Sequence, residues 1–173
     1  VGDCDYVIEA VLENLETKRT LLRQLDALLP AHAIIASNTS SLPLEAMESV
    51  LPPERRARFG VNHWFNPAHL IPLVELSCFG NMSEAAFAEV EALYAGIGKQ
   101  TIRVLKDVPG LVANRMQQGI AREAFSLLER GIAAPEDIDK ALKFGSAFRY
   151  ATTGPIAVAD FGGLDIWCTV GDN

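Results

Sequence analysis

Short apolar segments alternate with amphipathic helical segments over the first 105 residues of this chain. The apolar segments include YVIEA at residues 6–10 and AIIAS at residues 33–37. The segment between these two places leucines on one helical face, at positions 15, 22, 25 and 29. Strands that alternate with helices favour a parallel sheet, because each helix carries the chain back to start the next strand in the same direction. The sequence therefore predicts an α/β fold with a mostly parallel, doubly wound sheet.

Local signals place the other elements of this first half. Asn14 is a suitable N-cap for a helix over residues 15–29, and Pro43 can open a short helix that reaches about Val50. A further helix is expected from Ser83, where Met82 and Phe87 can form a hydrophobic staple. Three more strands are expected, at residues 58–65, 70–78 and 99–105.

The pattern changes after Asp107, where DVPG ends the last predicted strand. Only helical patterns follow, over residues 110–130, over residues 135–145 and within TTGPIAVADFGGLD at residues 152–165. We therefore expect two domains: an α/β domain over residues 1–107 and an all-helical domain over residues 108–173.

Composition excludes several classes of protein. The 173 residues are 49% hydrophobic and carry a net charge of −7, and the longest basic stretch is ERRAR at residues 54–58, so no nucleic-acid surface is expected. No apolar run approaches the roughly 20 residues that span a bilayer, and the first residues lack the basic region of a signal peptide. Cys4, Cys78 and Cys168 show no metal or disulfide spacing, which indicates reduced thiols and a cytoplasmic protein without a membrane partner.

The motif NHWFNP, residues 62–67, ends a predicted strand with polar side chains. In an extended chain His63 shares a face with Val61, and Glu75 shares a face with Leu73 in the next strand, so both polar residues lie on apolar faces. A buried carboxylate needs a partner, and His63 is the natural one for Glu75. A carboxylate on one imidazole nitrogen leaves the other free to act as a base. A core histidine and a strand-end glutamate explain the spacing equally well.

Two further signals have structural explanations as well as functional ones. SNTSS, residues 37–41, follows a predicted strand, where parallel sheets place ligands, but serine and threonine runs also cap helices. Asn114 lies inside a predicted helix, for which asparagine is a mediocre former, and a solvent-facing position would explain it.

Taken together, VLENLETK, ASNTSSL, HWFNP followed by PLVEL, and DVPGLVANR resemble the 3-hydroxyacyl-CoA dehydrogenase family in order and spacing. The resemblance covers about Asp5 to Asp165. It implies NAD-dependent oxidation of a 3-hydroxyl group to a 3-keto group. It also implies a Rossmann-type domain followed by a helical domain that forms a homodimer.

The resemblance assigns roles to individual residues. His63 matches the general base and Glu75 the carboxylate that orients it, while Asn114 matches a residue that holds the substrate oxygen. Ser40 matches a serine that contacts both substrate and nicotinamide. Cofactor contacts are further implied for three residues, Glu13, Lys18 and Asn66.

Two departures from the family pattern concern the ends of the chain. None of the 13 glycines falls in a GxGxxG phosphate loop. We therefore expect the phosphate-binding unit, and the acidic residue that distinguishes NAD from NADP, to lie before Val1, and the helical domain to continue past residue 173. On this interpretation the chain is the catalytic middle of an enzyme.

Other substrates and other classes stay open. NPAHLIPLVE is also similar to relatives that oxidise gulonate, carnitine or diketo esters, whereas RYATTGPIAVADFGGLD is closer to members that use acyl-CoA. A hydrolase triad of Ser40, His63 and Glu75 lacks the GxSxG turn. The three histidines lack metal-ligand spacing, and a non-catalytic relative would have little reason to keep all the site residues together.

Overall fold

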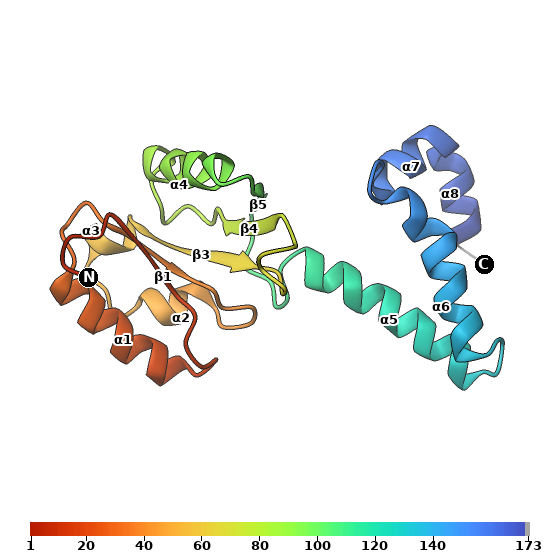
Figure 1. Cartoon of the computed structure of the whole chain (residues 1–173), viewed down its shortest axis with the longest axis horizontal. Coiled ribbons are helices and arrows are strands. Elements are labelled where there is room, and N and C mark those ends of the chain that lie inside the picture. Colours follow the sequence, from red (N-terminus) through yellow and green to blue (C-terminus); the bar gives the residue numbers. More distant parts are fainter. Residues whose placement is uncertain (172–173) are drawn as a thin grey trace. The chain divides into compact units, whose positions relative to one another are not determined.

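The computed structural model describes residues 1–171, and the chain divides into two compact units, Val1–Met116 and Gln117–Asn173. The first unit contains a five-stranded sheet in the order β1-β2-β3-β4-β5 (Figure 1). Its strands are β1 (Tyr6–Glu9), β2 (Ile34–Ser37), β3 (Phe59–Trp64), β4 (Leu73–Ser77) and β5 (Gln100–Val104). The predicted mostly parallel sheet is confirmed, because three of the four strand pairs are parallel and β3–β4 alone is antiparallel among the described residues.

Helices cover both faces of this sheet. Helices α1 (Leu15–Leu28) and α2 (Leu44–Glu48) pack on one face, and α4 (Glu84–Gly96) packs on the other (Figure 1). Adjacent residues of β2 show this division, because Ile35 belongs to the core under α1 whereas Ile34 belongs to the core under α4. Burial of both faces explains why β2 carries apolar residues at the successive positions 34, 35 and 36.

The predicted helix starts are confirmed. The Asn14 side chain accepts a hydrogen bond from the Thr17 amide at 3.0 Å, and Ser83 accepts one from the Ala86 amide at 3.2 Å. Met82 and Phe87, the expected staple, lie in the same apolar cluster. These contacts satisfy amide groups that the first turn of a helix leaves without partners.

One helix of the first unit was not expected from the sequence, the single turn α3 (Pro53–Arg56). It is held by Arg55, whose guanidinium donates to the Ala33 carbonyl at 2.7 Å and to Asp26 at 2.8 Å. Asp26 and Ala33 lie more than 20 positions before Arg55 in the sequence. The residue pattern of PPERR alone therefore does not predict this helix.

The second unit is helical, as predicted. Helix α5 (Ala113–Glu129) begins in the first unit and continues into the second, where it is followed by α6 (Pro135–Phe144), the 3₁₀ turn η1 (Ser146–Arg149), α7 (Pro155–Gly162) and α8 (Leu164–Gly171). The single helix expected over residues 152–165 is instead two, because Gly163 adopts φ 92° between α7 and α8. Gly131, at φ 63°, closes α5 as expected.

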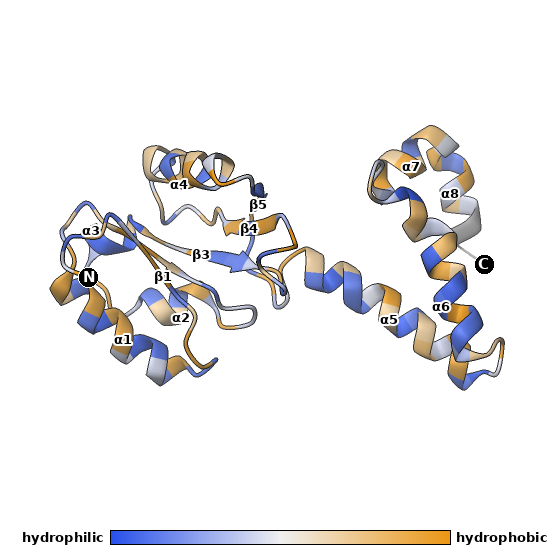
Figure 2. Cartoon of the chain, in the orientation of Figure 1, coloured by the Kyte–Doolittle hydropathy of each residue, from blue (hydrophilic) through white to orange (hydrophobic). Residues whose placement is uncertain are grey.

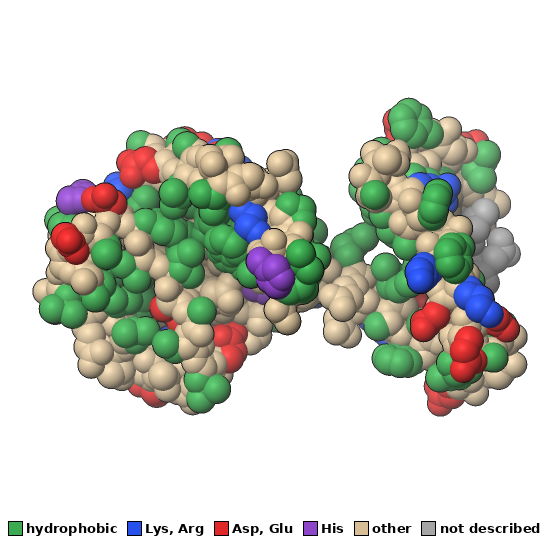
Figure 3. All heavy atoms as spheres, viewed as in Figure 1, with side chains coloured by type: hydrophobic (Ala, Val, Ile, Leu, Met, Phe, Trp, Pro, Cys, Tyr) green, Lys and Arg blue, Asp and Glu red, His purple; other side chains and the backbone are tan. Residues whose placement is uncertain are grey.

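Apolar side chains of the second unit face outward. Figure 2 shows hydrophobic residues along its helices, and Figure 3 shows many of them on the visible surface. Phe148 and Phe161 are 77% and 84% exposed, and no side chain of the described part of this unit is fully buried. Within residues 1–171 no helix combines the length and apolarity that crossing a bilayer requires.

Candidate active site

His63 and Glu75 face one another across the antiparallel pair of strands. They are register partners of β3 and β4, and His63 Nδ1 lies 2.7 Å from Glu75 Oε2. Both side chains are buried, Glu75 completely. The contact predicted from the two apolar strand faces is therefore present, and the antiparallel pairing explains how residues 12 positions apart meet.

The second carboxylate oxygen of Glu75 binds the start of α5. Glu75 Oε1 accepts hydrogen bonds from the Val112 and Ala113 amides, each at 2.9 Å. Burial alone would raise the pKa of Glu75, but the hydrogen bond from His63 and those from the two amides lower it below its ordinary value. Glu75 is thus held as an anion, and it ties the imidazole to the turn that precedes Asn114.

The other imidazole nitrogen is free. Among residues 1–171, His63 Nε2 has no hydrogen-bond partner. The Phe65 ring lies edge-on to the imidazole, with ring centroids 5.2 Å apart. A histidine fixed through Nδ1 to an anion and open at Nε2 can accept a proton there.

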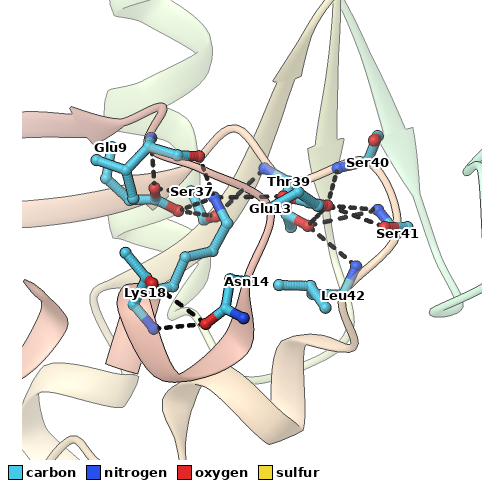
Figure 4. Close-up of polar contacts among 11 residues, drawn as sticks. Glu9, Glu13, Asn14, Lys18, Ser37, Thr39, Ser40, Ser41 and Leu42 are labelled. Atoms are coloured by element: carbon cyan, nitrogen blue, oxygen red, sulfur yellow. Dashed lines mark hydrogen bonds and ion pairs between the residues drawn. The ribbon is translucent and has the colours of Figure 1, made fainter. Parts of the chain in front are cut away.

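Ser40 lies in a loop that Glu13 organises (Figure 4). Glu13 Oε1 accepts hydrogen bonds from the Ser40 and Ser41 amides at 3.1 and 3.2 Å, and from the Thr39 and Ser41 hydroxyls at 2.5 and 3.0 Å. The Ser40 hydroxyl itself has no partner within the described chain and points away from Glu13 in Figure 4. SNTSS therefore does not cap α2, whose first amide, that of Leu44, donates to Asp107 instead.

Lys18 is buried on the apolar face of α1. The family resemblance implies a cofactor contact for this residue and gives no indication of its burial. Its side chain is 1% exposed. The ammonium donates to both oxygens of Glu9, at 2.8 and 2.9 Å, and lies 3.4 Å from Glu13 Oε2. The structure thus shows Lys18 bound to two carboxylates of its own chain.

Asn38 is a site residue that the sequence reasoning missed. Its Oδ1 accepts a hydrogen bond at 2.8 Å from the Trp64 amide, so it joins the SNTSS loop to the residue after His63. The Gly110 amide binds the same loop by donating to the Ser40 carbonyl at 3.2 Å. The position of Asn38 directly after a strand was the only available signal, because parallel strands β2 and β3 end at the same edge.

The remaining predicted residues lie near this edge without partners of their own. Asn66 follows β3 and is exposed, and Asn114 is half-buried in the first turn of α5. Neither side chain makes a hydrogen bond within the described chain. No group of three or more potential metal ligands occurs among residues 1–171, and His32 pairs with Asp5 at 2.8 Å.

Comparison with known proteins identifies the family. The model of the 3-hydroxyacyl-CoA dehydrogenase NAD-binding domain matches residues 1–108, and that of the C-terminal domain of the same enzymes matches residues 110–171. Human mitochondrial hydroxyacyl-coenzyme A dehydrogenase is 37% identical over 165 residues, which are 95% of this chain and 51% of the human protein. L-carnitine dehydrogenase of Streptomyces coelicolor is 38% identical over 156 residues, 90% of this chain and 48% of that protein.

A solved structure extends the similarity to the fold. The crystal structure of 5-formyl-3-hydroxy-2-methylpyridine 4-carboxylic acid 5-dehydrogenase, an NAD⁺-dependent dismutase, aligns with a TM-score of 0.90 at 36% identity. The alignment covers 98% of this chain and 54% of that one. The chain spans about half the length of the curated relatives it matches. On both sequence and fold, this chain belongs to the 3-hydroxyacyl-CoA dehydrogenase family.

Proposed function

We propose that the whole protein oxidises the 3-hydroxyl of a 3-hydroxyacyl-CoA to the 3-keto group with NAD, with His63 as general base. The observation that supports this most is the His63–Glu75 pair, which is buried, charge-assisted and open at Nε2. A core histidine would need no such free nitrogen at the edge where parallel strands place ligands.

Each residue of the site has a separate task in this reaction. His63 Nε2 takes the hydroxyl proton, and the Glu75 anion stabilises the imidazolium that results. Asn114 and Ser40 hold the substrate oxygen by hydrogen bonds. Bound NAD supplies the acceptor for the hydride that leaves the substrate carbon.

The residues present fit the nicotinamide end of NAD. The Ser40 hydroxyl and the Asn66 side-chain amide have no partner in the described chain. The Glu13 side chain, which accepts a hydrogen bond from the Ser40 amide, is 36% exposed. Unpaired donors of this kind at the carboxyl edge of a parallel sheet suit a polar amide and ribose. We assign Ser40, Asn66 and Glu13 to that end.

CoA thioesters are the proposed substrates because enzymes named for them, such as the human relative, align over 95% of this chain. The carnitine dehydrogenase is equally similar, so a 3-hydroxy acid without CoA is the second candidate. Both classes carry the same 3-hydroxyl, and the same dyad serves either one.

We further propose a cytoplasmic homodimer formed through the helical unit. The outward apolar side chains of that unit, Phe148 and Phe161 among them, need a covering surface. Cys4, Cys78 and Cys168 are unpaired, which fits a reducing compartment.

A substrate panel tests the proposal. NADH consumption by the whole protein is measured with acetoacetyl-CoA and with a diketo ester, and NADH formation with carnitine and with gulonate. The proposal expects the highest kcat/KM with the CoA thioester. Preference for carnitine or gulonate would establish the second candidate, and absence of turnover with all four would contradict a dehydrogenase of this substrate range.

A further inference from the structure

We infer that Lys18 is a positioning residue, whose ammonium, anchored on Glu9, orients the Glu13 carboxylate and through it the loop that presents Ser40. The inference rests on the proposed function for the task of Ser40, but the arrangement itself is a property of this chain. Figure 4 shows Glu9, Lys18, Glu13 and the loop in one connected set of polar contacts.

The position of Lys18 in α1 is unusual for a lysine. It lies three residues after Leu15 and four before Leu22, on the apolar stripe that packs on the sheet. Lysine is almost never fully buried unless it is paired. Its side chain, 1% exposed, must therefore be explained by the groups that surround the ammonium.

Glu9 provides the fixed end of the arrangement. It is the last residue of β1 and is 3% exposed. Besides both bonds from Lys18, its carboxylate accepts hydrogen bonds from the Ser37 hydroxyl and, at 3.2 Å, from the Val11 amide. Since β1 and β2 are paired strands of the sheet, the ammonium is held against a rigid support.

Glu13 provides the end that contacts the loop. One oxygen, Oε1, is occupied by the amides and hydroxyls of residues 39–41, and the other, Oε2, lies 3.4 Å from the Lys18 ammonium. A carboxylate whose two oxygens have different partners has a defined rotation. Burial alone would raise the pKa of Glu13, but the Thr39 and Ser41 hydrogen bonds and the Lys18 charge lower it, so the anionic form is favoured.

Glu13 positions Ser40 through a hydrogen bond to its backbone. The Ser40 amide donates to Glu13, and the Ser40 carbonyl accepts from the Gly110 amide, so the residue is held on both sides while its hydroxyl stays free. Lys18 touches neither the hydroxyl nor any group of the His63 dyad. Glu13 contacts both the Lys18 ammonium and the Ser40 amide, so we assign the influence of Lys18 on the reaction to Glu13.

The first test measures the loop directly, by hydrogen exchange of the Ser40 and Ser41 amides in the whole protein. Glu13→Gln keeps an oxygen for the loop but removes the charge that Lys18 attracts. Lys18→Met combined with Glu9→Gln removes the ammonium without leaving a buried anion unpaired. Each variant should raise exchange at both amides about tenfold, the order of one charge-assisted hydrogen bond.

A matched control is the pair Arg55→Met with Asp26→Asn. It also removes a partly buried ion pair at 2.8 Å from the same unit, but neither residue contacts the loop. It should leave exchange at residues 40 and 41 unchanged after correction for global stability. Exchange that stays at the wild-type rate in Glu13→Gln would overturn the inference, even if the Lys18 variant does not fold.

The second test is a double-mutant cycle measured on kcat. If Lys18 acts through Glu13, the Lys18→Met/Glu9→Gln change should lower kcat in the wild-type background and have little further effect in the Glu13→Gln background. Equal losses in both backgrounds would overturn the inference. Absence of wild-type turnover would refute the proposed function instead, and the exchange experiment would still decide the role of Lys18.

Discussion

His63 and Glu75 are direct partners across β3 and β4, the antiparallel strand pair in a sheet whose other described pairs are parallel. In a parallel pair, residues so close in sequence would have no opportunity to pair, because a crossover needs a dozen or more residues. Reversal of β4 brings the carboxylate opposite the imidazole. The same carboxylate also reaches the first amides of α5, so one side chain sets both the base and the turn before Asn114.

Glu75→Gln should destabilise the whole protein by about 2 kcal/mol near neutral pH, the order of charge-assisted hydrogen bonds lost by a buried acceptor. Because the folded-state pKa of Glu75 is lowered, its contribution is present above the unfolded pKa and is lost as the pH falls through the folded pKa. The difference in free energy of unfolding between wild type and Glu75→Gln, measured by urea denaturation, should therefore narrow from pH 7 toward pH 3. The matched control is Glu84→Gln, an exposed glutamate at the first position of α4. A difference in free energy of unfolding that stays constant or grows on acidification would contradict the ionised state of Glu75 in the folded protein.

Asn38→Ala should lower turnover about tenfold, because small shifts of positioning groups cost rates of this order or more. The reason is that Asn38 ties the Ser40 loop to the residue after His63. Asn81→Ala is the matched control. Asn81 donates a hydrogen bond at 2.5 Å to the carbonyl of Phe59, the first residue of β3, whereas Asn38 binds the amide of Trp64, the last residue of β3. Steady-state kinetics should show the loss in the first variant only. Equal kcat values in the two variants would remove Asn38 from the site.

Tyr94→Phe should destabilise the fold by about 1–3 kcal/mol, the range for buried groups left without a partner. The Tyr94 hydroxyl lies 2.8 Å from that of Tyr6 and accepts from Trp64 Nε1 at 3.2 Å and Asn62 Nδ2 at 3.3 Å. This cluster lies between α4 and the sheet and contains none of the side chains proposed to act in the reaction, so kcat should change little. Tyr150→Phe, at a residue 40% exposed, should leave the thermal midpoint in place. A Tyr94 variant as stable as wild type would show the cluster to be energetically neutral.

Much of this fold could be predicted because the signals are local. Asn14 and Ser83 cap the helices they were expected to cap, and the buried face of α1 follows from its leucines. Ile97 continues the helical spacing of Phe87, Val90 and Tyr94 in the sequence, but it is 58% exposed because α4 ends at Gly96.

The parts of the site that were missed depend on contacts between distant segments. Asn38 binds an amide 26 positions away, and nothing in SNTSS indicates which of its side chains does so. Lys18 could have been questioned from sequence, because a lysine on a leucine stripe requires an anion nearby. The contact of His63 with Glu75 was predictable because both residues interrupt apolar faces.

The isolated 173-residue chain should associate in solution. Its described helical unit has no fully buried side chain, and Ile156, Phe148 and Phe161 are 83%, 77% and 84% exposed. Exposed apolar surface on this scale favours self-association. Sedimentation velocity should show species larger than the monomer, growing with concentration. A concentration-independent monomer with a cooperative thermal transition would contradict this expectation.

The role of His63 as general base is tested most directly by the turnover of His63→Gln in the whole protein, measured with the best substrate of the panel. NADH binding is measured alongside by fluorescence. Glutamine keeps polarity and much of the size of histidine but does not accept a proton near neutral pH. Removal of a general base typically lowers turnover by about 10²- to 10⁴-fold. We expect a loss of turnover in that range with NADH affinity nearly unchanged. The His63→Gln/Glu75→Gln double variant should be little slower than the slower of the two single variants. Near wild-type turnover of His63→Gln would make His63 a core histidine and contradict the proposed role of the dyad.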